Sequence, residues 1–278
     1  MARGALGPLL LTAVAVVAGG CILDYDSLTR GAGDAGVQGP GDGDAGRFIP
    51  SPCVHITAAT GSFCIEATEV SRRQYAAFLA GSDGGAGQTS ACGWKTSHVP
   101  DAGPGSWPPN DAQLTLPVVG VDWCDAHAYC AWLGRHLCGA IGGGALPFGL
   151  VDEPGSDAWF VACTHDGLTP YPYGPSFDET KCIDSSGSSS RVEPGPVGTS
   201  TCVGGYAGIY DLSGNVREWI DACDGTSQQT DGCYHRGGWY ELGPASARTL
   251  MCQSTGANLG TEYRGWRDET LGFRCCGE

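Results

Sequence analysis

The sequence Asp211-Leu-Ser-Gly-Asn-Val-Arg-Glu-Trp219 places two carboxylates around a Gly-Asn pair in a stretch that reads as an irregular loop. The Gly-Asn pair predicts a turn, because both residue types adopt left-handed backbone conformations readily. Two interpretations of the acids remain open. Oxygen donors in an irregular loop suit a hard cation, whereas Glu218 can instead pair with an arginine such as Arg217 or Arg236.

Two further motifs, Arg236-Gly-Gly238 and Gly272-Phe-Arg-Cys275, follow this stretch along the chain. Together the three motifs resemble the formylglycine-generating enzyme (sulfatase-modifying factor) family. Weaker matches precede them in the family's order: Ile65-Glu-Ala-Thr-Glu-Val-Ser71, Pro117-Val-Val-Gly-Val-Asp-Trp123, Gly134-Arg-His-Leu-Cys138 and Tyr171-Pro-Tyr-Gly174. The resemblance implies an α+β fold related to C-type lectins, rich in loops and stabilised by disulfides.

The same resemblance raises a question about catalysis, because the family's copper site uses two cysteines shortly after Arg-Gly-Gly. Aligning Arg236-Gly-Gly238 on the family motif puts Leu242 and Ala247 at those two positions. A two-coordinate Cu(I) ion needs a pair of soft thiolates, and the chain contains no Cys-x4-Cys. Bound copper and catalytic residues are therefore not expected.

An enzymatic alternative stays open at this point. A divergent oxidase that converts a protein cysteine to formylglycine would build its metal site from other ligands, such as Cys252 with a C-terminal cysteine. Adjacent Cys275 and Cys276 are more simply explained as disulfide partners of two different cysteines. A count of free thiols separates the alternatives, because the oxidase needs reduced cysteines.

A structural calcium ion is the cofactor that the resemblance implies. In the family, the first residue's side chain, two backbone carbonyls and the glutamate of the motif hold the ion. Carried over to this chain, those roles fall to Asp211, Gly214, Val216 and Glu218. Oxygen donors of this kind are the ligands that calcium prefers.

The N-terminal region predicts export and anchoring. Residues 1–20 have a basic start, an apolar run and small residues before Cys21, as in a bacterial lipoprotein signal. Lipidation of Cys21 would attach the protein to a membrane, whereas an ordinary secretory signal would release it. A Gly-, Asp- and Ala-rich tether over 21–50 and one domain over 51–278 follow. We expect an exported, lipid-anchored protein on the periplasmic or surface side of the bacterial cell envelope.

The chain contains 15 cysteines, and an exported protein belongs to an oxidising compartment. Without Cys21 an even number of fourteen remains, which allows seven disulfides. Cys124 and Cys130 are six residues apart on an expected helix, hence about 9 Å apart along it, and should bond elsewhere. Two pairs are expected from the sequence, Cys223 with Cys233 and Cys138 with Cys163.

Charge and motif content exclude several function classes. Fifteen basic against 30 acidic residues give a net charge of −15, so nucleic acid is not an expected partner. The six histidines show no metal-binding spacing, and no Gly-x-Ser-x-Gly elbow or phosphate-binding loop is present.

Two helices are predicted from caps and apolar periodicity. Ser71 and Gln74 form a capping box for a helix that stops at Gly81, and Asp122 caps a second helix from Trp123 to about Leu133. Residues 81–110, 139–155 and 185–201 read as long loops. Disulfides and a bound cation are the expected means of holding them.

Taken together, these observations favour an extracytoplasmic binding or structural module over an oxidase. A peptide, a glycan or a partner protein is the expected class of ligand, on fold analogy alone, and the oligomeric state is not predicted. Four aromatic residues are candidates for lining a groove near the former copper positions, namely Trp239, Tyr240, Tyr263 and Trp266.

Overall fold

The computed structural model describes residues 48–82, 89–101, 107–184, 193–253 and 260–278. The signal 1–20, the lipidation residue Cys21 and most of the tether 21–50 lie outside these ranges. In chain order the α-helices and strands are β1 (Cys53–Ala58), β2 (Gly61–Glu66), α1 (Arg72–Gly81), α2 (Trp123–Trp132), β3 (His136–Leu137), α3 (Ala158–Thr164), β4 (Arg217–Cys223), β5 (Gly232–Arg236), β6 (Thr261–Tyr263), β7 (Leu271–Phe273) and β8 (Cys275–Gly277). Short 3₁₀ turns occur at Ser90–Cys92, Asp111–Gln113, Phe148–Leu150 and Pro244–Ser246.

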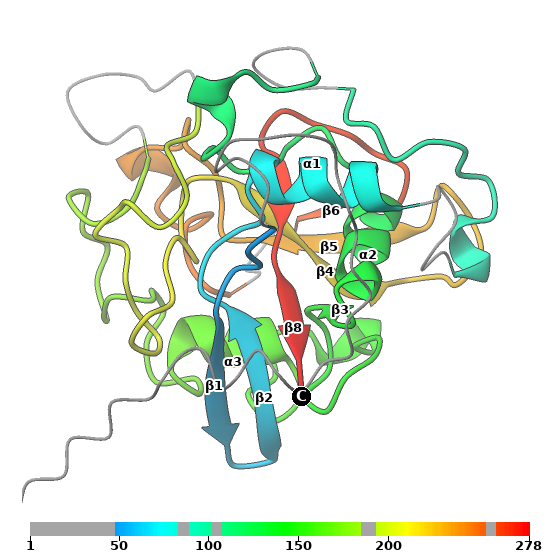
Figure 1. Cartoon of the computed structure of the whole chain (residues 1–278). Coiled ribbons are helices and arrows are strands. Elements are labelled where there is room, and N and C mark those ends of the chain that lie inside the picture. The colour runs from blue at the N-terminus through cyan, green and yellow to red at the C-terminus, as the bar shows by residue number, and fades with distance from the viewer. Residues whose placement is uncertain (1–47, 83–88, 102–106, 185–192, 254–259) are drawn as a thin grey trace, which may run out of the picture. The chain divides into compact units, whose positions relative to one another are not determined.

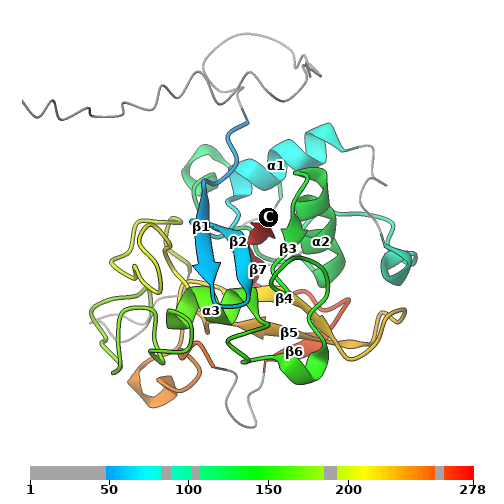
Figure 2. The same cartoon turned by 90° about the horizontal axis from the view of Figure 1, so that it is seen from below.

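Helices α1 and α2 begin where their caps predict. Ser71 accepts a hydrogen bond from Gln74 N at 3.3 Å, and the Gln74 side chain accepts one from Ser71 N at 2.8 Å. Asp122 and Asp125 form the same reciprocal box at the start of α2. The two helices lie side by side (Figure 2), with the rings of Tyr75 and Tyr129 stacked at 5.8 Å.

The strands form two four-stranded sheets. One has the order β1-β2-β8-β3, so the C-terminal strand β8 lies between β2 and β3 (Figure 1). The other has the order β6-β5-β4-β7, in which β4 and β7 are parallel and the other pairs antiparallel. Strand β4 begins at Arg217, inside the motif of residues 211–219, and the final motif of the sequence contributes to β7 and β8. The three motifs therefore meet in the centre of the domain.

Two apolar clusters fill the interior. One surrounds α3, whose residues are all buried, and the other lies between α1, α2 and β4. Two tryptophans link α2 to β4 reciprocally: Trp123 Nε1 donates to Ile220 O at 3.0 Å and Trp219 Nε1 donates to Val121 O at 3.1 Å. Both indole N–H groups are thus satisfied where they are buried.

All fourteen cysteines among the described residues form disulfides, which confirms the expectation of seven. The pairs are Cys53–Cys64, Cys92–Cys124, Cys130–Cys275, Cys138–Cys276, Cys163–Cys252, Cys182–Cys202 and Cys223–Cys233. The prediction for Cys223 with Cys233 is confirmed, as are the separate partners of Cys124 and Cys130 and of Cys275 and Cys276. The predicted pair of Cys138 with Cys163 is wrong, because β8 brings Cys276 beside β3 and leaves Cys163 facing Cys252.

The expected fold class is confirmed: helices and sheets are mixed, loops are long and disulfides are numerous. The Gly-rich segment 139–144 closes back on itself, with Ala140 N donating to Gly144 O at 3.0 Å. Gly139 is required there, because a Cβ would lie 2.5 Å from Gly144 O. Among the described residues, no helix has the length and apolar character needed to cross a bilayer.

Candidate functional site

Residues 211–216 form a tight turn that depends on left-handed backbone conformations. Asp211, Gly214 and Asn215 have φ of 60°, 76° and 57°, a region that glycine, asparagine and aspartate tolerate best. At Gly214 a Cβ would also lie 2.4 Å from Ile183 O. The backbone thus bends at the Gly-Asn pair.

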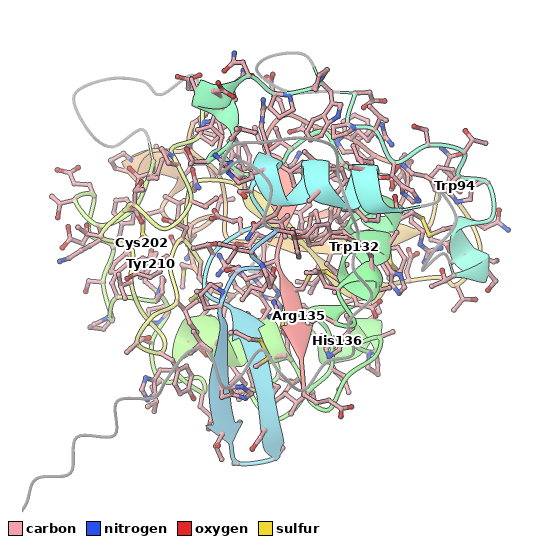
Figure 3. All side chains as sticks on the ribbon, in the orientation of Figure 1. Trp94, Trp132, Arg135, His136, Cys202 and Tyr210 are labelled. Atoms are coloured by element: carbon pink, nitrogen blue, oxygen red, sulfur yellow. A yellow bond between two sulfur atoms is a disulfide. The ribbon has the colours of Figure 1, made fainter. Side chains whose placement is uncertain are left out.

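The side chain of Asn215 holds this turn against two other segments. Its Oδ1 accepts from Gly195 N at 2.9 Å, and its Nδ2 donates to Glu69 Oε1 at 3.0 Å. Beside the turn, Asp211 N donates to Cys202 O at 2.9 Å. Cys202 and Tyr210, the residue before Asp211, are labelled close to each other in Figure 3. The turn is thus fixed by buried hydrogen bonds on several sides.

Glu218 forms a buried ion pair with Arg274 of the Gly-Phe-Arg motif. Arg274 donates through Nη2 to Glu218 Oε1 at 2.7 Å and through Nε to Oε2 at 2.8 Å, and Trp159 Nε1 donates to Oε2 at 2.9 Å. The side chains of Arg274 and Glu218 are 0% and 1% exposed. A bidentate, fully hydrogen-bonded pair is the geometry that makes a buried ion pair tolerable.

The expected arginine partners of Glu218 were therefore not the right ones. Arg217 pairs with Glu262 at 3.4 Å and with Asp268 at 3.2 Å. Arg236 donates to Asp152 at 2.7 Å and also pairs with Asp157, the N-cap of α3. Arg274 lies 56 residues from Glu218 in the sequence, so spacing along the chain does not reveal this contact, although Arg274 belongs to the Gly-Phe-Arg-Cys motif.

Three buried carboxylates share this region with the single guanidinium of Arg274. Burial raises the pKa of Glu69 well above its usual range, and the negative charges of Asp211 and Glu218 raise it further, against the lowering effect of Arg274. Glu69 Oε2 is buried without a hydrogen-bond partner in the structure. A proton on one of these carboxylates, such as Glu69, or a cation would neutralise the surplus of negative charge.

The donor set fits the predicted calcium ion only in part. The unpartnered Glu69 oxygen and the carboxylate of Asp211 suit a hard cation. Both oxygens of Glu218, however, already accept from Arg274 or Trp159, and Asp211 accepts from Ser200 Oγ and from Gly198 N at 2.8 Å. Among the described residues no cluster of three or more His, Cys, Asp or Glu side chains has metal-binding geometry. Calcium at Asp211, Gly214, Val216 and Glu218 stays a prediction, which the chelation experiment in the Discussion addresses.

The Arg-Gly-Gly motif lies at the end of β5. Gly237 and Gly238 have φ of 93° and 69°, and a Cβ on Gly238 would lie 2.8 Å from Leu250 Cδ2. The chain then contacts the turn of residues 211–216, where Tyr240 N donates to Asn215 O at 3.0 Å. The second and third motifs are thus both packed on the first.

Comparison with known proteins identifies this arrangement. Residues 14–278 match the sulfatase-modifying factor enzyme 1-like domain. The chain belongs to this family. Family membership confirms the resemblance found in the sequence and agrees with the fold described above.

The curated relatives include the inactive C-alpha-formylglycine-generating enzyme 2 of Mus musculus, 32% identical over 184 residues. The Bos taurus protein of the same name is 30% identical over 184 residues. The aligned part is 63% of this chain and 52% and 54% of those proteins, so the chain spans about half the length of the curated relatives it matches. Among solved structures, CarF superposes with a TM-score of 0.51 at 21% identity and covers 78% of this chain and 86% of its own, which supports the fold alone.

The positions of the family's copper cysteines lie on either side of the 3₁₀ turn Pro244–Ser246. Leu242 and Ala247, which the sequence motif predicts at those positions, are both half-buried. The cysteines considered as alternative copper ligands are in disulfides. Cys252 is bonded to Cys163, Cys275 to Cys130 and Cys276 to Cys138. No cysteine among the described residues of this family member offers a thiolate to copper.

The four aromatic residues expected to line a groove near these positions differ in how far they are exposed. Tyr240 is 1% exposed and belongs to the interior, whereas Tyr263 and Trp266 are 60% and 43% exposed. Trp239 is covered on one face by the guanidinium of Arg217, 5.3 Å from its ring centre. Tyr240 therefore cannot line an open groove, and Trp239 has its ring engaged within the molecule.

Proposed function

We propose that this sulfatase-modifying factor-like domain is a non-catalytic binding or structural module of an exported protein. The observation that carries the proposal is the absence of thiols at the copper positions, where Leu242 and Ala247 stand, while the described cysteines are held in seven disulfides. A Cu(I) site of the family type needs two thiolates. Relatives named as inactive formylglycine-generating enzymes support the same conclusion.

The test is direct. Purified protein is incubated with a cysteine-containing sulfatase-type peptide, oxygen, reductant and Cu(I), and the peptide is analysed by mass spectrometry beside an active family member. We expect no conversion of the cysteine to formylglycine. Conversion would mean that the chain is a divergent oxidase with a metal site made from other ligands.

A matched variant tests the reason as well as the outcome. Leu242→Cys combined with Ala247→Cys should create Cu(I) binding that the parent protein lacks, measured by competition with a chromogenic Cu(I) chelator. A thiol titration of the denatured parent protein should find no free cysteine within 51–278. Free thiols there would favour the oxidase.

The seven disulfides indicate an oxidising, extracytoplasmic environment. Within it we propose anchoring to the bacterial cell envelope through a lipid on Cys21, on the basis of the signal-like residues 1–20. Cys21→Ser should move the protein from the membrane fraction to the soluble fraction. Retention of that variant in the membrane fraction would contradict the anchor. We expect the ligand of the module to be a peptide, a glycan or a partner protein, and calcium at the 211–218 turn to have a structural role.

A further inference from the structure

A cavity of about 540 Å³ opens beside the segment that replaces the copper cysteines. Pro244, between Leu242 and Ala247, forms one wall, and the other walls come from residues 173–181. Binding sites for small molecules have volumes of roughly 300–1,000 Å³. The cavity is thus large enough for a ligand.

Aromatic rings form the apolar part of this cavity. Tyr173 and Phe177 line it, and both are half-buried. Behind them Tyr171 stacks on Tyr173 at 5.5 Å and contacts Phe177 at 5.9 Å. The Tyr171 hydroxyl donates to Ala247 O at 3.1 Å. The two rings are therefore held by aromatic contacts within the molecule while they line the cavity.

The polar part carries both acceptors and donors. Asp178 Oδ1 accepts from Thr180 N at 3.0 Å and Thr180 Oγ1 at 2.6 Å, which orients the carboxylate in advance. These hydrogen bonds lower the pKa of Asp178 and keep it ionised. Glu179 adds a second carboxylate and Lys181 an ammonium group. Two acids against one lysine leave a small net charge.

A second cavity of about 280 Å³ shares Tyr173 and Gly174 with the first. Its other walls include Leu168, which is 75% exposed, and Pro172. Tyr173 and Gly174, in the turn at 171–174, thus border both cavities. A linear ligand with repeating units can occupy both by crossing this turn.

We propose that the two cavities bind a neutral oligosaccharide. Sugar rings present apolar C–H faces that suit Tyr173 and Phe177, and their hydroxyls donate to carboxylates and accept from ammonium groups. A strongly charged ligand of either sign would be repelled by part of this wall, because the wall carries both carboxylates and an ammonium group. An apolar peptide would leave these polar groups without hydrogen-bond partners. This inference rests on the proposed function, because it names the ligand class of the same binding module.

The experiment uses the full-length protein with maltotriose, cellotriose, chitotriose and the corresponding monosaccharides. Saturation-transfer NMR from the aromatic protons should detect at least one trisaccharide, and titration calorimetry should show tighter binding than for its monosaccharide. Phe177→Leu, which keeps an apolar side chain without the ring, should weaken binding about three- to tenfold. Asp178→Asn keeps an acceptor for Thr180, removes the charge, and should weaken binding by a similar factor.

The matched control is Glu153→Gln, an exposed acid that lines neither cavity and whose replacement should leave binding unchanged. Near-UV circular dichroism confirms folding of each variant. Binding of none of the trisaccharides would overturn the proposal, as would binding that survives both Phe177→Leu and Asp178→Asn. Neither result touches the non-catalytic function, which fails only if the peptide cysteine is converted to formylglycine.

Discussion

The segments 211–219 and 239–247 both adjoin motifs that mark the family, yet they contribute to this protein in different ways. In the first, Asn215 and Glu218 are buried and hydrogen-bonded to Glu69, Arg274 and Trp159. In the second, Leu242 and Ala247 are half-buried, and Pro244 between them lines an open cavity. The first segment is thus held in the interior by polar contacts, whereas the second contributes to the surface of the domain.

The largest effect is expected from breaking the buried centre of the first segment. Arg274→Met removes the guanidinium that Glu218 pairs with and should lower the free energy of unfolding by about 3–5 kcal/mol. Arg248→Met, at an exposed position directly after the second segment, should change it by less than about 0.5 kcal/mol. Chemical denaturation of both variants measures the difference.

A double variant sharpens that result. Glu218→Gln in the Arg274→Met background removes the unpaired charge and should restore part of the lost stability. Equal stability of Arg274→Met and the parent protein would show that the ion pair does not hold the two motifs together.

Disulfides allow a second comparison, between a long-range link and a local one. Cys163–Cys252 joins α3 to the chain that follows the second segment across 89 residues, whereas Cys223–Cys233 closes a loop of 10. In the chain-entropy view, replacing both cysteines by alanine should cost about 4–5 kcal/mol for the long link and about 3 kcal/mol for the short one. Thermal unfolding of the two double variants gives the order, and a larger loss for the Cys223/Cys233 variant would refute it.

Calcium should stabilise the first region and leave the second unaffected. If the ion binds at the 211–218 turn, an excess of 100 times Kd should add about 2.7 kcal/mol to the free energy of unfolding. Glu69→Gln distinguishes a bound calcium ion from a protonated Glu69. If calcium neutralises the buried acids, the variant should gain less stability from calcium than the parent protein. If a proton on Glu69 does so, the variant and the parent protein should have similar stability. An identical melting temperature in calcium and in chelator would exclude the calcium site.

The smallest effect is a pH dependence of stability that originates in the buried centre. Burial raises the pKa of Glu66 to about 7, against the lowering influence of Cys275 N, Arg135 and Arg274, and burial raises that of Asp221 to about 6. A raised carboxyl pKa contributes stability that is present below the unfolded value of about 4.3 and is lost as the pH rises through the folded value. Stability should therefore fall, by on the order of 2 kcal/mol, between pH 5 and pH 8.

Glu66→Gln isolates the main contribution to this pH dependence. The variant loses the ion pair with Arg135, at 2.7 Å in the parent, so it should be less stable overall but should vary less with pH. Melting temperatures across pH 5–8 check both parts. A parent protein whose stability rises through this range would have the opposite linkage.

Local features of the fold could be predicted from the sequence because neighbouring residues decide them. The capping boxes at Ser71 and Asp122 place α1 and α2, since their hydrogen bonds join residues three apart. The pair Cys223–Cys233 follows from a short polar loop between two strands. The expected end of α2 at Leu133 differs from the observed Trp132 by one residue, which is within the usual spread of helix ends.

Long-range features could not be predicted in the same way. The pairing of Cys138 with Cys276 depends on β8 lying between β2 and β3, and the partner of Glu218 depends on β7 lying parallel to β4. Spacing along the sequence does not distinguish Arg274 from Arg217 or Arg236 as the partner of Glu218. The sequence also did not predict the cavity at Tyr173, although Tyr173 belongs to the Tyr171-Pro-Tyr-Gly174 motif.

By itself the sequence determined the family, the fold class and the two capped helices. These properties depend on residue identity and on spacing over a few positions. Only the tertiary structure decided which cysteines and charges meet, that Tyr240 is buried, and that two cavities flank Tyr173. The physical reason is that contacts between distant segments are selected by packing of the whole core, which no local pattern encodes.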